Sequence, residues 1–275
     1  MSNRQDTGLK RTTLDKYYTT PHIVSECIEM FKENIQFSNN DVGIEPSAGN
    51  GSFIQSINSL FDTCHFYDTH PEHPDIQKQD FLAIEPSHFS KYETKIHAIG
   101  NPPFGRQSSL AIQFIKKTCQ FADTISFILP RSFKKESMKK RFASNFHLKV
   151  EYDLPDNSFT VNGTPHTVPC VFQIWEKRDY ERPKPEVLKP IGFKFVKKDE
   201  SPDISFRRVG VYAGKISREI DDKSIQSHYF IKFDKKITQN LFNKISKLQF
   251  KSMDDTVGAR SISKQELIKE LIKVL

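Results

Sequence analysis

The amino-acid sequence predicts an α/β domain, in which a parallel sheet carries helices on both faces, followed by a smaller α+β module. Three observations lead to this fold class. Short apolar segments of strand length alternate with polar or amphipathic stretches from about residue 16 to 178, as in parallel sheets whose strands are joined by helices. The stretch 176–203 then changes character, because four prolines stand among mixed charges. Beyond it, two strand-like segments precede two helical ones, which suits a compact module.

The elements of the first domain follow from local pattern. Each expected strand is a short apolar run, and each expected helix is a longer polar or amphipathic stretch. In the third expected helix, apolar residues between Leu110 and Cys119 give one broad face that a sheet can cover. The expected strands are 42–45, 64–68, 96–99, 125–129, 150–153 and 168–175, and the expected helices are 21–34, 51–60, 107–121 and 132–143.

The second half of the chain is organised more simply. The last expected helix places apolar residues from Leu267 to Leu275 on one side, so it can pack on a sheet. The expected elements there are strands at 204–212 and 228–233 and helices at 236–247 and 263–275. We expect a flexible arm over 1–15, the α/β domain over 16–178, a linker over 179–203 and the small module over 204–275.

Composition excludes several classes of protein. The chain has 275 residues, of which 27% are charged, the ordinary range for a folded soluble protein. Its most apolar runs, 125–129 and 168–175, are far shorter than the ~18 residues of a spanning helix, and its first residues lack the apolar core of a signal peptide. We therefore expect a protein that is not secreted and has no membrane partner, in the cytoplasm, nucleoid or nucleus of a cell or virus-infected host.

A glycine-rich loop follows the first strand of the expected sheet and opens a helix. Gly49 and Gly51 let the backbone turn sharply and approach a ligand closely. Asp68 ends the next strand, 19 residues after Gly49, where a carboxylate can accept both ribose hydroxyl protons. The loop lacks the Lys and Ser/Thr of a phosphate-binding P-loop, and Ile54 stands where a dinucleotide motif has its third glycine. The pattern therefore favours a nucleoside ligand without a pyrophosphate.

Two further turns carry candidate ligand contacts. The turn Gln79-Asp-Phe-Leu82 offers the Asp80 carboxylate to an adenine amino group and the Phe81 ring to the face of a base. Asn101-Pro-Pro-Phe104 follows another strand. Its two prolines remove two backbone donors and hold the chain extended, which leaves the Asn101 side-chain carbonyl and the Pro102 backbone carbonyl as acceptors. Such a corner suits a planar amino group, with Phe104 stacking on the attached ring.

These motifs resemble the S-adenosylmethionine-dependent amino-methyltransferases, specifically those that act on adenine N6. Glu45-Pro-Ser-Ala-Gly-Asn-Gly51 looks like their cofactor loop, and Asn101-Pro-Pro-Phe104 looks like their catalytic signature. Lys16-Tyr-Tyr-Thr-Thr-Pro21 resembles their F-Y-T-P-P segment, with Thr20 where proline is common. The order of these motifs is that of the gamma class, and the resemblance covers about residues 16–178.

The resemblance implies a Rossmann-like class I methyltransferase fold with a seven-stranded, mostly parallel sheet, whose terminal strands 148–153 and 168–175 pair. It implies S-adenosylmethionine as cofactor and no metal. The catalytic residues that it implies are Asn101, Pro102, Pro103 and Phe104. The cofactor-binding residues expected from the resemblance and from the motifs are Tyr17, Tyr18, Thr19, Glu45, Pro46, Ala48, Gly49, Gly51, Phe53, Asp68, Asp80 and Phe81.

Positive charge points to the partner. The net charge of +7 permits a polyanion but does not prove one. The residues that we expect to contact nucleic acid are Arg106, Arg131, Lys134, Lys135, Arg207 and Arg208. We expect double-stranded DNA as the partner, with the small module as a target-recognition region. A separate restriction endonuclease, as in restriction-modification systems, stays open as a second partner, and so does the oligomeric state.

Three alternative functions stay open at this level. The same acceptor corner occurs in RNA adenine methyltransferases and in methyltransferases that act on glutamine N5 of proteins, because glutamine also presents a planar amino group. A nucleic-acid-binding protein with a decayed cofactor site is the alternative that is not an enzyme.

Overall fold

The structure, a computed structural model, describes residues 17–256 and 258–275, so the expected arm over 1–15 lies outside the described residues. The chain divides into two compact units. Of the described residues, the first unit comprises those up to Phe133 together with Ser137–Arg182, and the second comprises Lys134–Glu136 and Pro183–Leu275. Each unit has a hydrophobic core of its own.

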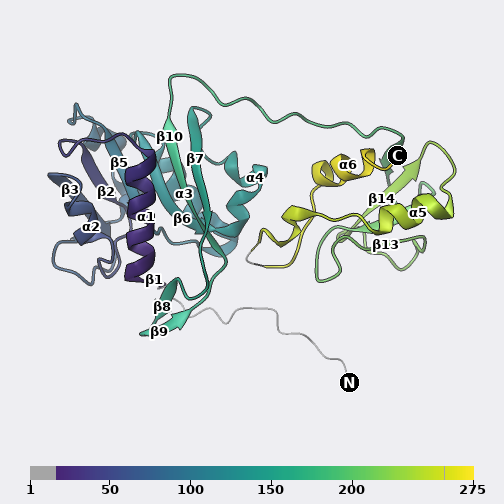
Figure 1. The fold of residues 1–275 in the computed structure, drawn as a ribbon, viewed down its shortest axis with the longest axis horizontal. Helices are drawn as coiled ribbons and strands as arrows, with labels where there is room; N and C mark the ends of the chain where they lie inside the picture. Colours follow the sequence, from purple (N-terminus) through teal and green to yellow (C-terminus); the bar gives the residue numbers. More distant parts are fainter. Residues whose placement is uncertain (1–16, 257) are drawn as a thin grey trace. The chain divides into compact units, whose positions relative to one another are not determined.

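The first unit is built on a seven-stranded sheet (Figure 1). Its strands, from one edge to the other, are β4 (Gln77–Lys78), β3 (Thr63–Asp68), β2 (Val42–Glu45), β5 (Ile96–Gly100), β6 (Thr124–Pro130), β10 (Cys170–Lys177) and β7 (Phe146–Asp153). β10 runs antiparallel to both of its neighbours, and the other six strands all run in the same direction. The seven-stranded, mostly parallel Rossmann-like arrangement that the resemblance implies is therefore confirmed, including the pairing of its two last strands.

Helices cover both faces of this sheet. α1 (Pro21–Asn34) and α2 (Ile54–Asn58) pack on one face, where Phe31 and Phe172 are buried. α3 (Ser109–Thr118) packs on the other, around Phe127 and Trp175. α1 matches its expected range because its buried residues recur at helical spacing behind a proline at the helix start.

A small separate sheet lies beside the main one. β1 (Tyr18–Thr19) pairs with β8 (Phe159–Val161), which pairs in turn with β9 (Thr164–His166). The β8–β9 turn consists of Asn162 and Gly163, both with positive φ, as two-residue hairpins require. This hairpin was not among the expected elements, and it holds the segment at residues 18–19 in place.

Two expected helices are shorter than their patterns predict. In place of one helix over 132–143, the structure forms a short 3-10 helix (Arg131–Lys134) and then α4 (Glu136–Lys139), which buries no residue. Without an apolar face, no packing energy extends a helix that short. Within 51–60, α2 starts only at Ile54, because the glycine loop occupies the first positions with φ of +54° and +85° at Gly49 and Gly51.

The second unit is a four-stranded antiparallel sheet with two helices. In sheet order its strands are β11 (Phe193–Val196), β14 (His228–Phe233), β12 (Ile204–Arg207) and β13 (Ile216–Ser217). α5 (Gln239–Ser246) and α6 (Lys264–Ile272) contribute Ile245, Leu267 and Leu271 to its core. β11 lies in the range expected as a linker, and β12 ends at Arg207 rather than continuing to residue 212. Among the described residues, no helix is long and apolar enough to cross a membrane.

Candidate active site

A cavity of about 470 Å³ opens at the carboxyl ends of β2, β3 and β5. This is the edge at which open parallel sheets bind ligands. Tyr17, Tyr18, Thr19, Glu45, Ser47, Ala48, Gly49, Asn50, Ser52, Phe53, Asp68, Thr69, His70, Glu72, Asn101, Pro102, Pro103, Phe104 and Leu110 line it. Among the described residues, the lining contains three carboxylates and neither Lys nor Arg, so this part of the cavity suits a ligand that carries positive charge.

Asp68 ties the glycine loop to the end of β3. Its Oδ2 accepts a hydrogen bond from the Gly49 N–H at 2.8 Å, and its Oδ1 accepts one from the His70 N–H at 2.8 Å. Gly49 has a φ of +54°, which a residue with a side chain adopts only with strain. Each carboxylate oxygen keeps a second lone pair, so Asp68 can both shape the loop and accept ligand hydroxyl groups.

Glu45 is a buried carboxyl group at the end of β2. Its residue is 2% exposed, and its Oε2 has no hydrogen-bond partner among the described residues. Burial raises the pKa of Glu45 well above its ordinary value, and the nearby Asp68 charge raises it further. Gly100 makes room for this side chain, since a Cβ there would stand 3.0 Å from Glu45 Cγ. The cavity therefore holds a carboxyl group that favours its neutral form until a positive charge comes near.

The Asn101 side chain is held through its nitrogen. Nδ2 donates to the Tyr17 carbonyl and to the Thr19 hydroxyl, both at 3.3 Å. Its carbonyl oxygen is used by neither bond. No described residue donates to the Pro102 carbonyl, because the two prolines interrupt backbone pairing after β5. The acceptor corner expected from the sequence thus lines the cavity with both carbonyls uncommitted.

Residues 17–19, at and just before β1, also line this cavity. Tyr17 stacks on His166 with ring centroids 5.4 Å apart, and Tyr18 donates from its hydroxyl to Glu72 Oε1 at 2.7 Å. Thr19 is 5% exposed and pairs with Phe159 in the small sheet. These contacts place residues 17–19 beside Asn101, although more than 80 residues separate them in sequence.

Four of the expected cofactor-binding residues do not line the cavity. Pro46 is buried, and Gly51 packs towards Ile54 and His73 instead. Asp80 is exposed, and its carboxylate accepts from the Leu82 N–H at 2.9 Å as a helix cap. Phe81 is 1% exposed and stacks on Phe114, because the face of the sheet beneath α3 needs a large apolar side chain there. Its placement therefore offers no ring face to a ligand.

Sequence reasoning missed seven lining residues. Leu110 carried no sequence signal, and Glu72 is recognisable only through its bond to Tyr18. Ser47, Asn50 and Ser52 lie inside the glycine loop, and Thr69 and His70 directly follow Asp68, so proximity to recognised motifs was the only available signal.

The residues expected to contact nucleic acid are spread over both units. Arg106 is exposed just after the acceptor corner, whereas Arg131 lies 3.4 Å from the Asp153 carboxylate. Arg207 and Arg208 donate to the backbone carbonyls of Val209 and Gln226. Lys134 and Lys135, both partly buried, are grouped with the second unit.

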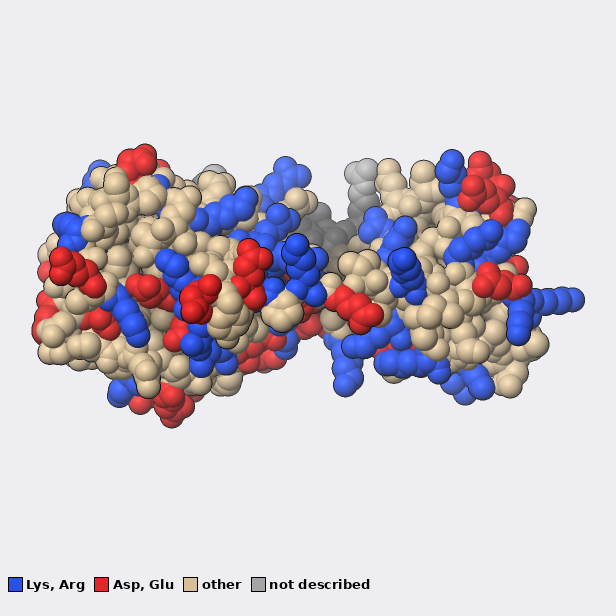
Figure 2. Space-filling view, turned by 90° about the horizontal axis from the view of Figure 1, so that it is seen from above, with Lys and Arg blue, Asp and Glu red and all other residues tan. Residues whose placement is uncertain are grey.

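Charge divides unevenly along the chain. Residues 183–275 contain 20 Lys and Arg against 12 Asp and Glu, a net charge of +8. Residues 1–182 contain 21 against 22, a net charge of −1. Figure 2 shows Lys and Arg side chains over the visible face of the second unit. The positive charge that indicates a polyanionic partner therefore belongs to the second unit.

No protein-family profile matches the chain, and no curated protein matches it in sequence. Among solved structures, a protein provisionally named as the modification subunit of a type I restriction enzyme from Vibrio vulnificus YJ016 matches with a TM-score of 0.45 and 12% identity, over 59% of this chain and 44% of that chain. This chain thus spans less than half of that subunit's length.

Two other solved structures match over more of their own length. A protein provisionally named as an RNA methyltransferase from Pyrococcus horikoshii has a TM-score of 0.45 and 14% identity, over 62% of this chain and 91% of that chain. The 23S rRNA methyltransferase ErmE has a TM-score of 0.43 and 13% identity, and the match covers 60% of this chain and 71% of that chain. Similarity this remote assigns no activity, so the functional argument depends on the residues of the cavity.

Proposed function

We propose that this chain transfers a methyl group from S-adenosylmethionine to the N6 amino group of adenine in DNA. The observation that carries the proposal is the fixed orientation of Asn101. Its amide nitrogen is held by Tyr17 and Thr19, so its carbonyl oxygen is the atom left to accept from a ligand.

The lining suits this cofactor. S-adenosylmethionine carries a sulfonium and an ammonium group, and the described residues of the lining contribute the carboxyl groups of Glu45, Asp68 and Glu72 and no lysine or arginine. The unpartnered Oε2 of Glu45 is a buried acceptor that a cationic ligand would satisfy. Asp68 would hold the ribose hydroxyl groups, and Phe53 would add apolar contact. When bound, the cofactor supplies an electrophilic methyl group on a sulfonium leaving group.

The acceptor corner would raise the reactivity of the amine. The lone pair of an aromatic amine is delocalised into the ring, so the nitrogen is a poor nucleophile. The Asn101 side-chain carbonyl and the Pro102 backbone carbonyl together accept both of its N–H groups, which draws electron density back to the nitrogen. Catalysis by this chain then consists of orientation and electrostatics.

A base in a duplex must leave the stack to reach this corner. Flipping costs a few kcal/mol, and stacking on an aromatic ring returns ~1–3 kcal/mol. Phe104 is half-buried beside the acceptor corner, and its carbonyl accepts from the N–H groups of Leu110 and Ala111. These bonds anchor Phe104 to the start of α3, so it would act as a fixed platform.

The test is methyl transfer from labelled S-adenosylmethionine to unmethylated duplex DNA, total RNA and protein substrate in parallel. We expect label in N6-methyladenine of DNA. We expect Asn101→Ala to lower kcat by about 1,000-fold, in the range of removing one oriented acceptor or donor at a reacting centre, while cofactor affinity stays within threefold of wild type. If the labelled product resists DNase but is released by RNase or protease, the substrate is RNA or protein rather than DNA.

A binding experiment separates an enzyme from a non-catalytic protein. Thermal unfolding with and without S-adenosylhomocysteine reports on the cofactor site alone. Lack of stabilisation at high ligand concentration would favour a nucleic-acid-binding protein with a decayed site. Full transfer activity in Asn101→Ala would refute the mechanism.

A further inference from the structure

A second, larger cavity lies wholly within the second unit. It measures about 880 Å³ and opens where β11 ends, β14 begins and α6 begins. Its lining consists of Phe195, Val196, Lys197, Lys198, Asp199, Arg208, Asp221, Ile225, His228, Tyr229, Phe230 and Lys264. The proposed methyl transfer makes no use of this cavity.

Four cationic side chains surround it without acidic partners. They are Lys197, Lys198, Arg208 and Lys264. Among the described residues, none of the four pairs with a carboxylate within 4.0 Å. Lys198 instead donates to the backbone carbonyl of Asp221 at 2.7 Å, and Arg208 donates to that of Gln226 at 2.7 Å. Uncompensated cations gathered at one concave site favour an anionic ligand.

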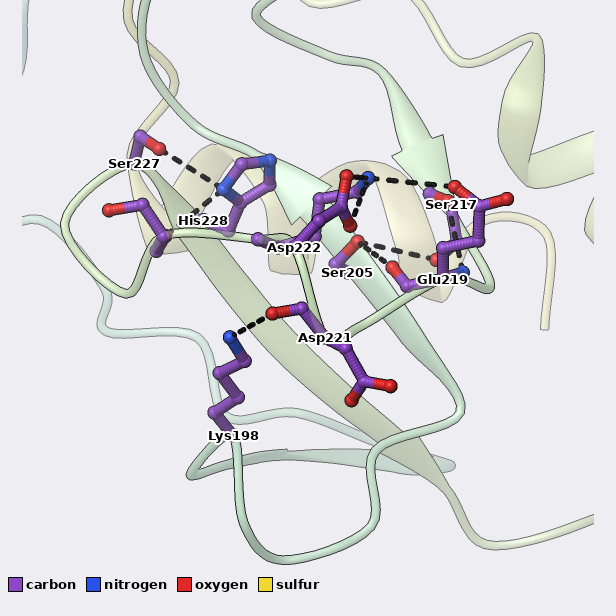
Figure 3. Close-up of polar contacts among 10 residues, drawn as sticks. Lys198, Ser205, Ser217, Glu219, Asp221, Asp222, Ser227 and His228 are labelled. Atoms are coloured by element: carbon purple, nitrogen blue, oxygen red, sulfur yellow. Dashed lines mark hydrogen bonds and ion pairs between the residues drawn. The ribbon is translucent and has the colours of Figure 1, made fainter.

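The two carboxylates in the lining do not cancel this charge. Figure 3 shows the Lys198 ammonium directed at the Asp221 main chain, with the Asp221 carboxylate pointing away from it. Asp199 is exposed. Other contacts hold the neighbouring loop, in which Lys223 pairs with Asp222 and His228 Nδ1 lies 3.0 Å from the Ser224 carbonyl.

Aromatic rings hold two of the cations in place. The Lys264 ammonium lies 4.7 Å from the ring centre of Phe195 and 5.6 Å from that of Tyr229. The Arg208 guanidinium lies 5.6 Å from the ring centre of Tyr229. These cation–π contacts position the charges without neutralising them. The hydrophobic Ile225, which is 70% exposed, adds apolar surface to the same lining.

We infer that this cavity binds a phosphate-bearing nucleotide, with the phosphate on the Lys264 and Arg208 side and the base or sugar against the apolar part of the lining. A bare inorganic anion would use the cations but not the rings or Ile225. Both a nucleic-acid strand and a free nucleotide have the required chemistry. The inference goes beyond the proposed methyl transfer and does not depend on it.

The test uses the full chain and two probes, a short labelled single-stranded oligonucleotide and ADP. The variant is Lys264→Ala with Arg208→Ala, and the matched control is Lys269→Ala, an exposed lysine of the same helix outside the lining. Thermal unfolding confirms that each variant is folded. For the strand, we expect the slope of log affinity against log salt to fall by about 1.4, because each lost phosphate contact removes about 0.7. The control should keep the wild-type slope.

The two probes distinguish the sources of the phosphate. A strand that binds with the lower salt slope in the double variant supports a polymeric ligand. ADP that binds wild type and loses at least tenfold in affinity in the double variant supports a free nucleotide. Equal affinities and slopes in the double variant and Lys269→Ala, or a wild-type protein that binds neither probe, would overturn the inference. Cofactor binding is measured separately, so failure here is distinguishable from failure of the proposed function.

Discussion

The two units present cavities of opposite electrostatic character. In the part of the chain that the structure describes, the cavity of the first unit is lined by Glu45, Asp68 and Glu72 and by no lysine or arginine. The cavity of the second unit has four cations against two carboxylates. The first suits a small cationic cofactor and the second a phosphate. The net charge of +7 for the whole chain does not reveal this difference between the two cavities. The difference indicates which unit should bind the cationic ligand and which the anionic one.

Replacing Asp68 should have the largest effect on the ligand preference of the first cavity. Asp68→Ala deletes the acceptor for two backbone N–H groups as well as the expected ribose contact. We expect cofactor affinity to fall about 100-fold, since unsatisfied or lost bonds of this kind cost roughly 1–3 kcal/mol each. Isothermal titration calorimetry measures the affinity, and oligonucleotide binding should stay at the wild-type level.

Asp80→Ala is the matched control for that variant. Asp80 caps a short helix and does not line the cavity, so we expect cofactor affinity to change less than threefold, with a stability cost of roughly 0.5–2 kcal/mol from the lost cap. A loss of affinity as large as that of Asp68→Ala would restore the role in adenine binding that the sequence predicts for Asp80.

Replacing Glu45 by glutamine tests how much its buried carboxyl group contributes to the electrostatic character of the first cavity. Because burial raises the pKa of Glu45, the group binds a proton in the empty protein at pH values where it is ionised when unfolded. Stability from this group is therefore present at low pH and is lost as the pH rises from the ordinary glutamate value through the raised one. Glu45→Gln should remove this pH dependence of the melting temperature.

The same variant should weaken binding of the cationic cofactor. We expect a loss of about tenfold, equivalent to roughly 1.4 kcal/mol for one charge-assisted contact. Wild-type protein should release a proton when the ligand binds, and Glu45→Gln should not. Calorimetry in two buffers of different ionisation enthalpy measures that proton, and identical proton counts in both proteins would contradict the assignment.

The smallest expected effect comes from a change that leaves charge untouched. Thr19→Val removes one of the two bonds that orient Asn101 and keeps the buried shape. We expect kcat to fall by about fivefold, equivalent to roughly 1 kcal/mol for one neutral bond, with cofactor affinity unchanged. Thr160→Val, on the strand that pairs with β1, is the control. Steady-state kinetics decides, and a larger change in KM than in kcat would contradict a positioning role.

Local patterns predicted much of the first unit. The apolar runs at 42–45 and 96–99 are strands with those or nearly those bounds, because β-branched residues between turns have few other conformations that bury them. The hairpin at 159–166 also has a local signal, because Asn162-Gly163 is a favoured two-residue hairpin turn. In the second unit, the strand expected over 204–212 ends at Arg207, and Gly210, with a φ of +101°, takes the chain out of the extended conformation before residue 212 is reached.

What the sequence by itself determined was the chemistry of each motif and its place at a strand end: the glycine turn, the acidic residue after the next strand and the two prolines beside Asn101. Tertiary structure alone decided which of these groups line a cavity. It brought Thr19 to Asn101, turned Phe81 into the core, left Glu45 Oε2 without a partner among the described residues and gathered four cations at one cavity of the second unit. The reason is that backbone conformation follows from neighbouring residues, whereas burial and partnership depend on segments that are distant in sequence.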